Sequence, residues 1–418
     1  MKHIVFILGS YYPNYSAVGK CLGNIADVLV LKNKITVISM KNTVIQANKD
    51  FYNKQVILRV TTKYLEKRMF IEEKLKQTAG LRNKRLKLVQ HSLKLHGFFK
   101  TLMSKETIDN QLVTAYQKAL LDVSDPVDII IPTCNPFESV VTAMKYKENN
   151  PDVEIIPYLF DLFAENLNLN RLSLNRALKR KNNMQLENEM FEKSKSVLYV
   201  ANWTSYIKKY YSQYYEKTIE VEHPLLLKID ERKAKKIDDK IHIVYTGIVD
   251  FKNRNPDHVL EILTQLKSEK IVIDFYTFGS GEDIIEQYAE RYANRIVAHG
   301  KVSSDEAGIA RSTSNILLSI GNVDTSQIPS KLFEYMSAGK AILHFAYTKS
   351  DPAIQILNNY PVKMIVLRNQ KMDIEMLECF IFKNSQTNIS FDEIFENYSS
   401  ASPEMIAQIL EHIIFENE

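Results

Sequence analysis

The sequence predicts an α/β protein built from two halves, each with a parallel sheet. Short runs of β-branched and other apolar residues alternate with helical patterns, and this alternation occurs twice along the chain. A length of 418 residues exceeds what one ordinary core accommodates, so two domains of about 200 residues each are expected. Glu222, His223 and Pro224 are followed by a charged stretch at residues 228–240, which has the composition of a linker.

The expected strands are short runs rich in β-branched residues. In the first half they lie at residues 3–8, 35–39, 127–131, 153–158 and 196–200, with helices between them. In the second half they lie at residues 241–246, 271–278, 295–299, 316–320, 341–345 and 362–366. The corresponding domains cover residues 1–222 and 241–395, with a linker at 223–240 and a last helix at 396–418 that could pack back on the first domain.

Composition places the chain among soluble globular proteins. Apolar residues make up 45% of the sequence and charged residues 25%. No run of about eighteen consecutive apolar residues occurs, so no membrane-spanning helix is expected. The apolar run at residues 4–8 is too short for a signal peptide and predicts a first strand. Cys21, Cys134 and Cys379 lack metal-ligand spacing and are expected to be buried, reduced thiols, which favours a cytoplasmic location.

The segment at residues 327–343 carries the most specific functional signal. Pro329 or Ser330 can begin a helix there, and Gly339 can end it before the next strand. The free backbone N–H groups and the dipole at such a helix start attract an anion. The segment therefore combines a helix start, an anion site and a helix stop between two apolar runs.

Lys331 and Glu334 give this helix its chemical character. Lys331 lies where a phosphate would bind, and Glu334, one turn further along the same face, could accept hydrogen bonds from ribose hydroxyls. The pair predicts a site for a nucleotide-sugar diphosphate. An ordinary amphipathic helix after a proline turn fits the same segment about as well, because it would bury Leu332, Phe333 and Met336.

Glycine turns follow two further strands of the second half. Gly247 would let the backbone come close to a phosphate, and Lys252 and Arg254 could stabilise the charge that grows on a diphosphate as its bond to the sugar breaks. A solvated turn would also explain these two cations. Gly279 and Gly281 follow a strand and begin a helix, which alone is a weak signal, because such glycine pairs are common.

Together these residues resemble the donor site of GT-B glycosyltransferases of the GT4 family. The proline–serine–lysine turn, the leucine–phenylalanine–glutamate–tyrosine helix and the alanine–glycine–lysine end at residues 329–340 are similar to the signature of that family. The resemblance covers nearly the whole chain and implies two Rossmann-like domains whose parallel sheets face a central cleft. One position departs from the pattern: the first glutamate of the family, eight residues before Glu334, is Ser326 in this sequence.

The resemblance implies a role for each matching residue. Glu334 would hold the ribose, the catalytic cations Lys331 and Arg254 would bind the diphosphate, and Val302 would contact the base through its backbone. It also implies transfer with retention, without a metal or other cofactor, from a nucleotide diphosphate sugar. UDP is the expected nucleotide. The implied donor-binding residues are Gly247, Arg254, Gly279, Val302, Ser326, Pro329, Ser330, Lys331, Leu332 and Glu334.

The amino-terminal half is expected to bind the acceptor. Gly19 begins an apolar-periodic helix after a loop that contains Tyr15, and it resembles the family glycine that approaches the transferred group. Asp161 and Glu165 resemble a strand-end aspartate and a nearby glutamate in relatives that elongate polysaccharides. Asp161 would be the catalytic residue that orients or deprotonates an acceptor hydroxyl. A helix here would place both carboxylates on one face, although Asp161 as a simple helix N-cap fits equally well.

Residues 63–105 form a basic stretch within a helical insert expected near residues 63–122. The stretch contains twelve Lys and Arg residues against three Glu residues, a net charge of +9, whereas the whole chain carries +4. Apolar residues are interleaved with these charges, which predicts a basic amphipathic segment. Peripheral contact with the inner face of the plasma membrane is one expectation, and a solvated helix face is the other. Nucleic acid is not an expected partner, because no recognisable binding module accompanies the charge.

The expected function is that of a glycosyltransferase of the hexosyltransferase type, class EC 2.4. It would act on a hydroxyl of a glycan or lipid-linked glycan in the synthesis of cell-surface polysaccharide. Two alternatives are compatible with the sequence. Ser326 at the glutamate position fits an inactive glycosyltransferase-like partner subunit, and sugar-nucleotide epimerases share the fold. Acceptor-dependent turnover by the isolated chain would exclude both.

Overall fold

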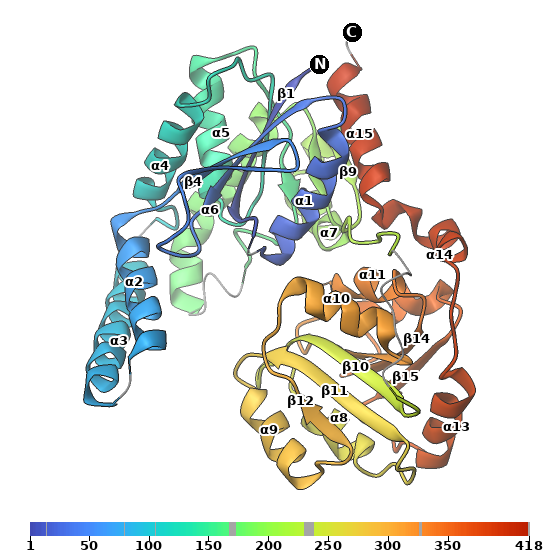
Figure 1. Ribbon diagram of the computed structural model, residues 1–418. Coiled ribbons are helices and arrows are strands. Elements are labelled where there is room, and N and C mark those ends of the chain that lie inside the picture. The colour runs from blue at the N-terminus through green and yellow to red at the C-terminus, as the bar shows by residue number, and fades with distance from the viewer. Residues whose placement is uncertain are drawn as a thin grey trace. The chain divides into compact units, whose positions relative to one another are not determined.

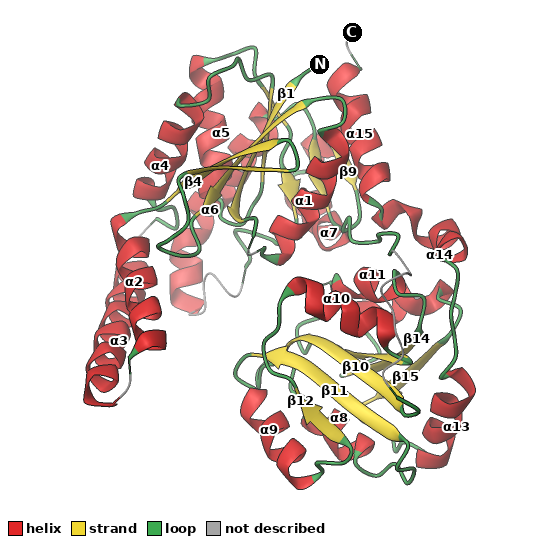
Figure 2. Cartoon of the chain, in the orientation of Figure 1, coloured by secondary structure: helices red, strands yellow, loops and turns green. Residues whose placement is uncertain are grey.

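The chain forms two compact units (Figure 1). The first comprises Met1–Pro224 and Pro403–Glu418, and the second comprises Leu225–Ser402. The computed structural model describes residues 1–13, 15–78, 80–104, 106–166, 173–229, 238–325 and 328–416. Strands and helices alternate in both units (Figure 2), which confirms the predicted α/β class.

A six-stranded sheet forms the centre of the first unit. Its strand order is β3-β4-β2-β1-β5-β6, and every pair is parallel except β3 with β4. Strand β1 lies in the middle and is buried over most of its length, which explains why its sequence is a continuous apolar run. The strands are β1 (His3–Ser10), β2 (Lys34–Met40), β3 (Lys49–Tyr52), β4 (Gln55–Val60), β5 (Ile129–Pro132) and β6 (Glu154–Ile155).

The sequence-based prediction missed the hairpin formed by β3 and β4. Its two-residue turn consists of Asn53 and Lys54, whose φ angles are 44° and 65°. Positive φ at both positions is the turn geometry that matches the twist of a hairpin, and asparagine followed by glycine is its usual sequence. In this turn Lys54 takes the place of the glycine, so the usual hairpin sequence is absent.

The single strand expected at residues 153–158 is two strands in different sheets. β6 pairs with β5, whereas β7 (Tyr158–Leu159) belongs to a three-stranded parallel sheet of order β7-β8-β9. Pro157 lies between β6 and β7, and a proline has no N–H to donate to a strand ladder. The remaining strands of this second sheet are β8 (Val197–Tyr199) and β9 (Thr218–Glu220).

Helices α2 (Lys63–Gln77) and α3 (Gly80–Met103) form a hairpin, seen side by side in Figure 1. The amide of Asn83 closes the turn between them by donating to the carbonyl oxygens of Leu75 and Thr78, at 3.2 and 2.6 Å. A Cβ at Gly97 would lie 2.7 Å from the hydroxyl of Tyr64, so the two helices approach closely there.

The other helices of the first unit pack on its sheets. Helix α4 buries Leu112, Val113, Tyr116 and Leu120, and the Tyr116 hydroxyl donates to the carbonyl oxygen of Leu8 at 2.7 Å. The insert expected near residues 63–122 is therefore confined to the hairpin, because α4 belongs to the core. These helices are α1 (Ala17–Leu29), α4 (Asn110–Leu121), α5 (Glu138–Asn149), α6 (Ser173–Lys193), α7 (Thr204–Tyr210), α15 (Pro403–Phe415) and the 3₁₀ helices η1 (Ala201–Trp203) and η2 (Ser212–Lys217).

The second unit contains one parallel six-stranded sheet of order β12-β11-β10-β13-β14-β15. The chain winds outwards from β10 in one direction and from β13 in the other, which is the doubly wound arrangement of a Rossmann-like domain. Ile243 of β10 pairs with Ile273 of β11 and with Ile316 of β13. The strands are β10 (Ile241–Ile248), β11 (Ile271–Phe278), β12 (Ile296–Ala298), β13 (Ile316–Ile320), β14 (Ala341–Ala346) and β15 (Lys363–Leu367).

Helices lie on both sides of this sheet. Figure 2 shows α10 over one face, and α9 packs beside β11 and β12. Ser303 and Glu306 form a reciprocal capping box that begins α10. The helices are α8 (Asp257–Leu263), α9 (Glu282–Arg291), α10 (Ser304–Thr313), α11 (Lys331–Met336), α12 (Pro352–Ile356), α13 (Ile374–Asn384), α14 (Phe391–Tyr398) and the 3₁₀ helices η4 (Leu357–Asn359) and η5 (Ser399–Ala401).

The boundaries of the units differ from the expected domain limits. Leu226 N donates to the carbonyl oxygen of Ala401 at 3.0 Å, so the chain already pairs within the second unit soon after Pro224. Of the linker expected at residues 223–240, residues 230–237 lie outside the described part. At the other end, the second unit extends to Ser402, and α15 packs on α1 of the first unit.

Two further expectations concerned the burial of the cysteines and the presence of a membrane-spanning helix. Cys21 and Cys134 are buried as expected, whereas Cys379 is exposed. Cys379 lies between Leu377 and Ile381 on α13, and these two residues supply the buried side of the helix. Within the described residues, no helix has both the length and the apolar character needed to cross a membrane.

Candidate functional site

The strand order of the second unit indicates where a ligand would bind. In doubly wound sheets, ligands lie outside the carboxyl ends of the strands, at the point where the connections of two neighbouring strands diverge. This switch point lies between β10 and β13. Gly247 is near the end of β10, and Asn322 follows β13. The candidate donor site is at this edge of the sheet.

Gly247 and Lys331 lie against each other at the end of β10. Gly247 has a φ of 149°, a conformation that side chains rarely adopt. A Cβ built there would lie 3.5 Å from Cδ and 3.6 Å from Cε of Lys331, so the lysine side chain passes directly over the glycine. The cation predicted to hold a phosphate therefore lies at the carboxyl end of β10.

Tyr335 fixes α11 to β10. Its hydroxyl accepts a hydrogen bond from Thr246 N at 2.9 Å and donates to the carbonyl oxygen of Thr246 at 3.2 Å. Burial raises the pKa of Tyr335, so the hydroxyl keeps its proton as a donor. Leu332 is buried beside it, whereas Lys331 and Glu334 keep some exposure to water. One helix face is thus anchored while the other presents charges.

The short helix α11 begins and ends near the residues that the sequence indicated. Pro329 and Ser330 precede its first residue, and Gly339 follows it with a φ of 65°. The left-handed conformation at Gly339 is the usual way in which a glycine ends a helix. Ser326, the position that departs from the family pattern, lies outside the described residues together with Gln327.

Glu334 is paired with Arg311, a residue that the sequence-based prediction did not include. Nη2 of Arg311 lies 3.0 Å from Oε2 of Glu334, and the two side chains are only 8% and 11% exposed. Nη1 of Arg311 donates to Oγ1 of Thr246 at 3.3 Å. Arg311 therefore orients the carboxylate and ties α10, α11 and β10 together. Its sequence signal was weak, because an arginine in the last turn of a helix commonly compensates the helix dipole.

Arg254 reaches across the switch point. Its Nε and Nη2 donate to Oδ1 of Asn322 at 3.0 and 2.6 Å. The tight hairpin before it is closed by two backbone hydrogen bonds between Asp250 and Arg254, each 3.1 Å long. Lys252 lies on the exposed tip of this hairpin. A solvated turn thus describes Lys252, whereas Arg254 lies at the candidate site.

Gly279 allows the turn after β11 to contact the end of β10. Its φ is 125°, and a Cβ there would overlap the carbonyl oxygen of Val249. Gly281 N donates to the same oxygen at 3.3 Å. Val302 lies in the connection between β12 and α10 and is half-buried. Among the described residues, no hydrogen bond joins Val302 to another predicted donor residue.

The predicted acceptor residues Tyr15 and Gly19 lie beside the end of β1 in the first unit. A Cβ at Gly19 would overlap the carbonyl oxygen of Ser10, so only glycine fits there. Oγ of Ser16 accepts from Gly19 N at 3.0 Å and caps α1. The ring of Tyr15 packs edge-on against Tyr11, with centroids 5.3 Å apart. The loop is therefore held at the carboxyl end of the central strand.

Asp161 and Glu165 follow β7, but their segment is not a helix, and the expectation of a shared helix face is wrong. Two of its N–H groups bond to side chains from distant segments instead. Asp161 N donates to Sγ of Cys134 at 3.4 Å, and Ala164 N donates to Oε1 of Glu187 at 3.0 Å. For the same reason Asp161 is not a helix N-cap.

The two carboxylates differ in their surroundings. Oε1 of Glu165 pairs with Nε of Arg180 at 2.6 Å. No hydrogen bond to the Asp161 carboxylate is found within the described residues, and burial raises its pKa. A raised pKa makes a carboxylate a better proton acceptor near neutral pH. Of the two, Asp161 has the surroundings of a general base.

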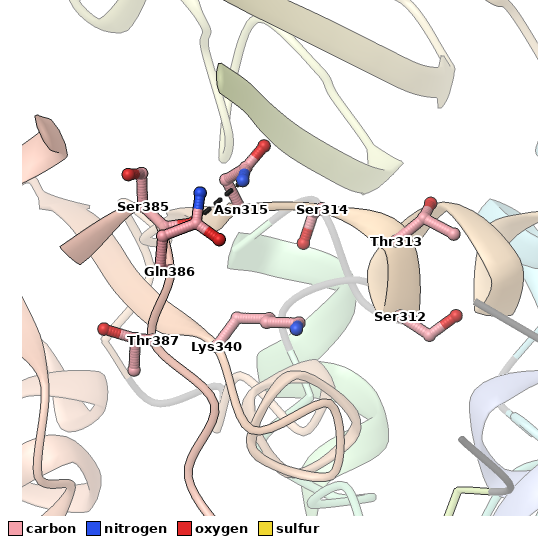
Figure 3. A pocket seen from close by; sticks show the side chains of 8 residues that line it. All are labelled: Ser312, Thr313, Ser314, Asn315, Lys340, Ser385, Gln386 and Thr387. Carbon is pink, nitrogen blue, oxygen red and sulfur yellow. Dashed lines mark hydrogen bonds between the residues drawn. The ribbon is translucent and has the colours of Figure 1, made fainter. Parts of the chain in front are cut away.

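A separate pocket of about 190 Å³ lies at the opposite edge of the sheet of the second unit (Figure 3). Asn315 precedes β13 and Lys340 precedes β14, so the pocket is at the amino ends of these strands. Nδ2 of Asn315 donates to the carbonyl oxygen of Ser385 at 2.8 Å. Lys340 supplies a cation near the carboxyl ends of α10 and α13, where helix dipoles favour one. The pocket is not part of the candidate donor site.

The structure thus gathers five predicted donor residues at one edge of the sheet. They are Gly247, Arg254, Gly279, Lys331 and Glu334. The charges brought by these residues are two cations and one carboxylate. In the described part of the chain, no group of three or more His, Cys, Asp or Glu side chains is placed to hold a metal ion.

Comparison with known proteins identifies the fold. No protein-family model and no curated protein sequence matches the chain. Sucrose-phosphate synthase from Thermosynechococcus elongatus is 10% identical with a TM-score of 0.63, covering 100% of this chain and 99% of that one. The N-terminal domain of trehalose-6-phosphate phosphatase from Candida albicans is 12% identical with a TM-score of 0.61, covering 100% and 97%. HepE from Anabaena, in complex with UDP and glucose, is 10% identical with a TM-score of 0.57, covering 100% of both chains. The predicted GT-B fold is confirmed.

Proposed function

We propose that the chain is a GT4-type glycosyltransferase that moves a sugar from a nucleotide diphosphate sugar to a hydroxyl of a glycan or lipid-linked glycan. The main support for this proposal is that Lys331, Arg254 and Glu334, which is paired with Arg311, lie at the switch point between β10 and β13. Two proteins of similar fold support this reaction class. One is named a sucrose-phosphate synthase, and the other, HepE, was solved in complex with UDP and glucose. The proposal includes retention, independence from metal, UDP as the nucleotide, and a role in cell-surface polysaccharide synthesis.

The chemistry follows from the charges at the site. The bond between the anomeric carbon and the phosphate oxygen breaks, and a bond from the acceptor oxygen to the same carbon forms. Negative charge grows on the leaving diphosphate, where Lys331 and Arg254 stabilise it. The Glu334 carboxylate accepts hydrogen bonds from the ribose hydroxyls. Asp161 of the first unit orients the acceptor hydroxyl or accepts its proton, for which its raised pKa is suited.

Nucleotide binding tests the proposal directly. Titration calorimetry with UDP, GDP and ADP should give selective binding of UDP. Glu334→Ala should weaken that binding by roughly 10- to 100-fold, because hydrogen bonds to a charged group contribute about 1.5–3 kcal/mol. Glu334→Gln preserves the shape of the side chain and should show a similar loss. The control is Glu286→Ala, an exposed glutamate on α9 that should not alter the affinity.

Turnover separates the remaining possibilities. If none of the three nucleotides binds, the transferase proposal is overturned in favour of an inactive partner subunit. If UDP binds, the consumption of a UDP-sugar should depend strictly on an added acceptor glycan. Conversion of the sugar nucleotide without an acceptor would instead indicate an epimerase.

A further inference from the structure

The hairpin of α2 and α3 carries a strong positive charge. Nine Lys and Arg side chains of the hairpin have described positions, and all nine are exposed. Only Arg68 forms an ion pair within the hairpin among these described groups, with Oε1 of Glu72 at 2.9 Å. Helix α3 itself has six Lys and Arg residues and no Asp or Glu. The described basic side chains of α3 therefore have no carboxylate on their own helix and no ion pair within the hairpin.

Helix α3 also has two apolar faces, of which α2 covers one. Leu86 and Leu93 are half-buried on the face that contains Gly97, which approaches Tyr64 of α2. The opposite face carries Leu88 and Leu95, seven residues apart and therefore on the same side of the helix. Their side chains are 70% and 44% exposed. This second face is therefore accessible to solvent at both leucines.

Charged and apolar side chains lie together on this exposed face. Lys84 and Arg85 precede Leu88 by four and three residues, which places them next to it on the helix surface. Phe98 follows Leu95 by three residues and is 48% exposed. A helix of 24 residues is about 36 Å long. It can therefore lie along a planar surface with its leucines pointing in and its basic groups at the rim.

We propose that this face of α3 docks on a lipid bilayer with anionic headgroups. Such a surface accepts leucine and phenylalanine side chains at the acyl boundary and binds lysine and arginine in the headgroup layer. An acidic protein surface would neutralise the charges, but it would leave the exposed leucines without a matched apolar layer. The docking is independent of the reaction proposed above, and it would bring the chain to the surface that holds lipid-linked acceptors.

Vesicle flotation of the full chain tests the docking. The chain should bind vesicles of phosphatidylcholine and phosphatidylglycerol mixed roughly three to one, and should not bind vesicles of phosphatidylcholine alone. Binding should weaken at high salt. Lys84→Gln with Arg85→Gln should lower the partition coefficient by roughly 30-fold. Leu88→Ser with Leu95→Ser should lower it by roughly tenfold or more.

Matched controls test whether binding depends on this face of α3 or on the exposed charges and leucines of the first unit in general. Leu31→Ser with Leu121→Ser removes two leucines of the same unit that are each 73% exposed. Lys118→Gln with Lys145→Gln removes two exposed charges from α4 and α5. Both controls should bind vesicles as the unaltered chain does.

Three outcomes would overturn the docking proposal. The first is an absence of binding to anionic vesicles, and the second is equal loss of binding in the control and α3 variants. The third is concentration-dependent self-association that the leucine substitutions abolish while vesicles are ignored, because the face would then be an interface between two copies. UDP titration of the same preparation reports on the donor site separately, so failure of one proposal is distinguishable from failure of the other.

Discussion

Replacing Arg311 with methionine tests the buried ion pair that orients Glu334. Methionine fills much of the same space but cannot donate to Glu334 or to Thr246. The Glu334 carboxylate, 11% exposed, would lose its arginine. Removing one partner of a buried pair typically costs about 3–5 kcal/mol. We expect Arg311→Met to destabilise the second unit by about 3 kcal/mol, at the lower end because Glu334 keeps some exposure to water.

A double-mutant cycle isolates the pair from the packing. Glu334→Gln added to Arg311→Met replaces the carboxylate that has lost its arginine with a neutral amide and should recover about 2 kcal/mol. Denaturant unfolding, monitored through hydrogen exchange at the α11 amides, measures the free energy of unfolding of the second unit. Trp203 is the sole tryptophan of the chain and belongs to the first unit, so its fluorescence serves as an internal control. Arg291→Met, at an exposed position on α9, should change neither signal.

The same variant should also weaken UDP binding at a temperature where the second unit stays folded. A carboxylate that has lost its arginine is oriented less firmly, and we expect at least about a tenfold loss of affinity. Arg311→Lys keeps a charge but loses the fork that contacts Glu334 and Thr246 together, and should give an intermediate loss. Additive stabilities in the cycle, with unchanged UDP affinity, would refute the idea that Arg311 positions Glu334.

Two further predictions concern backbone space and titration. Gly279→Ala should destabilise the second unit by about 2–4 kcal/mol in a thermal or denaturant melt, because its Cβ would overlap the Val249 carbonyl at a positive φ. Gly281→Ala, where a Cβ would have its nearest neighbours at 3.4 Å, should cost only a few tenths of that amount, and an equal cost would contradict the reasoning. Burial, followed by the charge of Glu220, raises the pKa of Glu222 to about 7. The folded state therefore holds that proton more tightly than the unfolded state, and stability should fall as the pH rises from about 4.5 to 7. Glu222→Gln should remove this loss and be more stable than the unaltered chain by up to about 3 kcal/mol at pH 8, with little difference at pH 4, as measured by unfolding at both pH values.

The features that the sequence predicted well are those set by neighbouring residues. The strand limits at residues 271–278 and 316–320 agree with β11 and β13, because buried parallel strands have continuous apolar sequences. The turn that begins α11 and Gly339, which follows the helix, were likewise readable from local residue types. Lys331 and Glu334 could be placed on one short helix for the same reason.

The features that were missed depend on contacts between distant segments. Arg311 acquires its role only when α10 packs next to α11, and no local pattern distinguishes it from a dipole-compensating arginine. Asp161 and Glu165 have helical spacing, but two N–H groups of their segment bond to Cys134 and Glu187, which are far away in sequence. Tertiary hydrogen bonds thus outweighed a local preference in the very segment assigned to the acceptor.

The two units share a strand order and a close glycine contact at a strand end, although their sequences differ. Without the edge strand β3, the order β4-β2-β1-β5-β6 in the first unit corresponds to β12-β11-β10-β13-β14 in the second. In each, a glycine contacts a carbonyl oxygen near the end of the first strand: Gly19 on Ser10 and Gly279 on Val249. A side chain at either position would push the following turn or helix away from the switch point. In both units the glycine therefore keeps the turn or helix close to the strand end, and the polar residues at the two strand ends are what distinguishes the units.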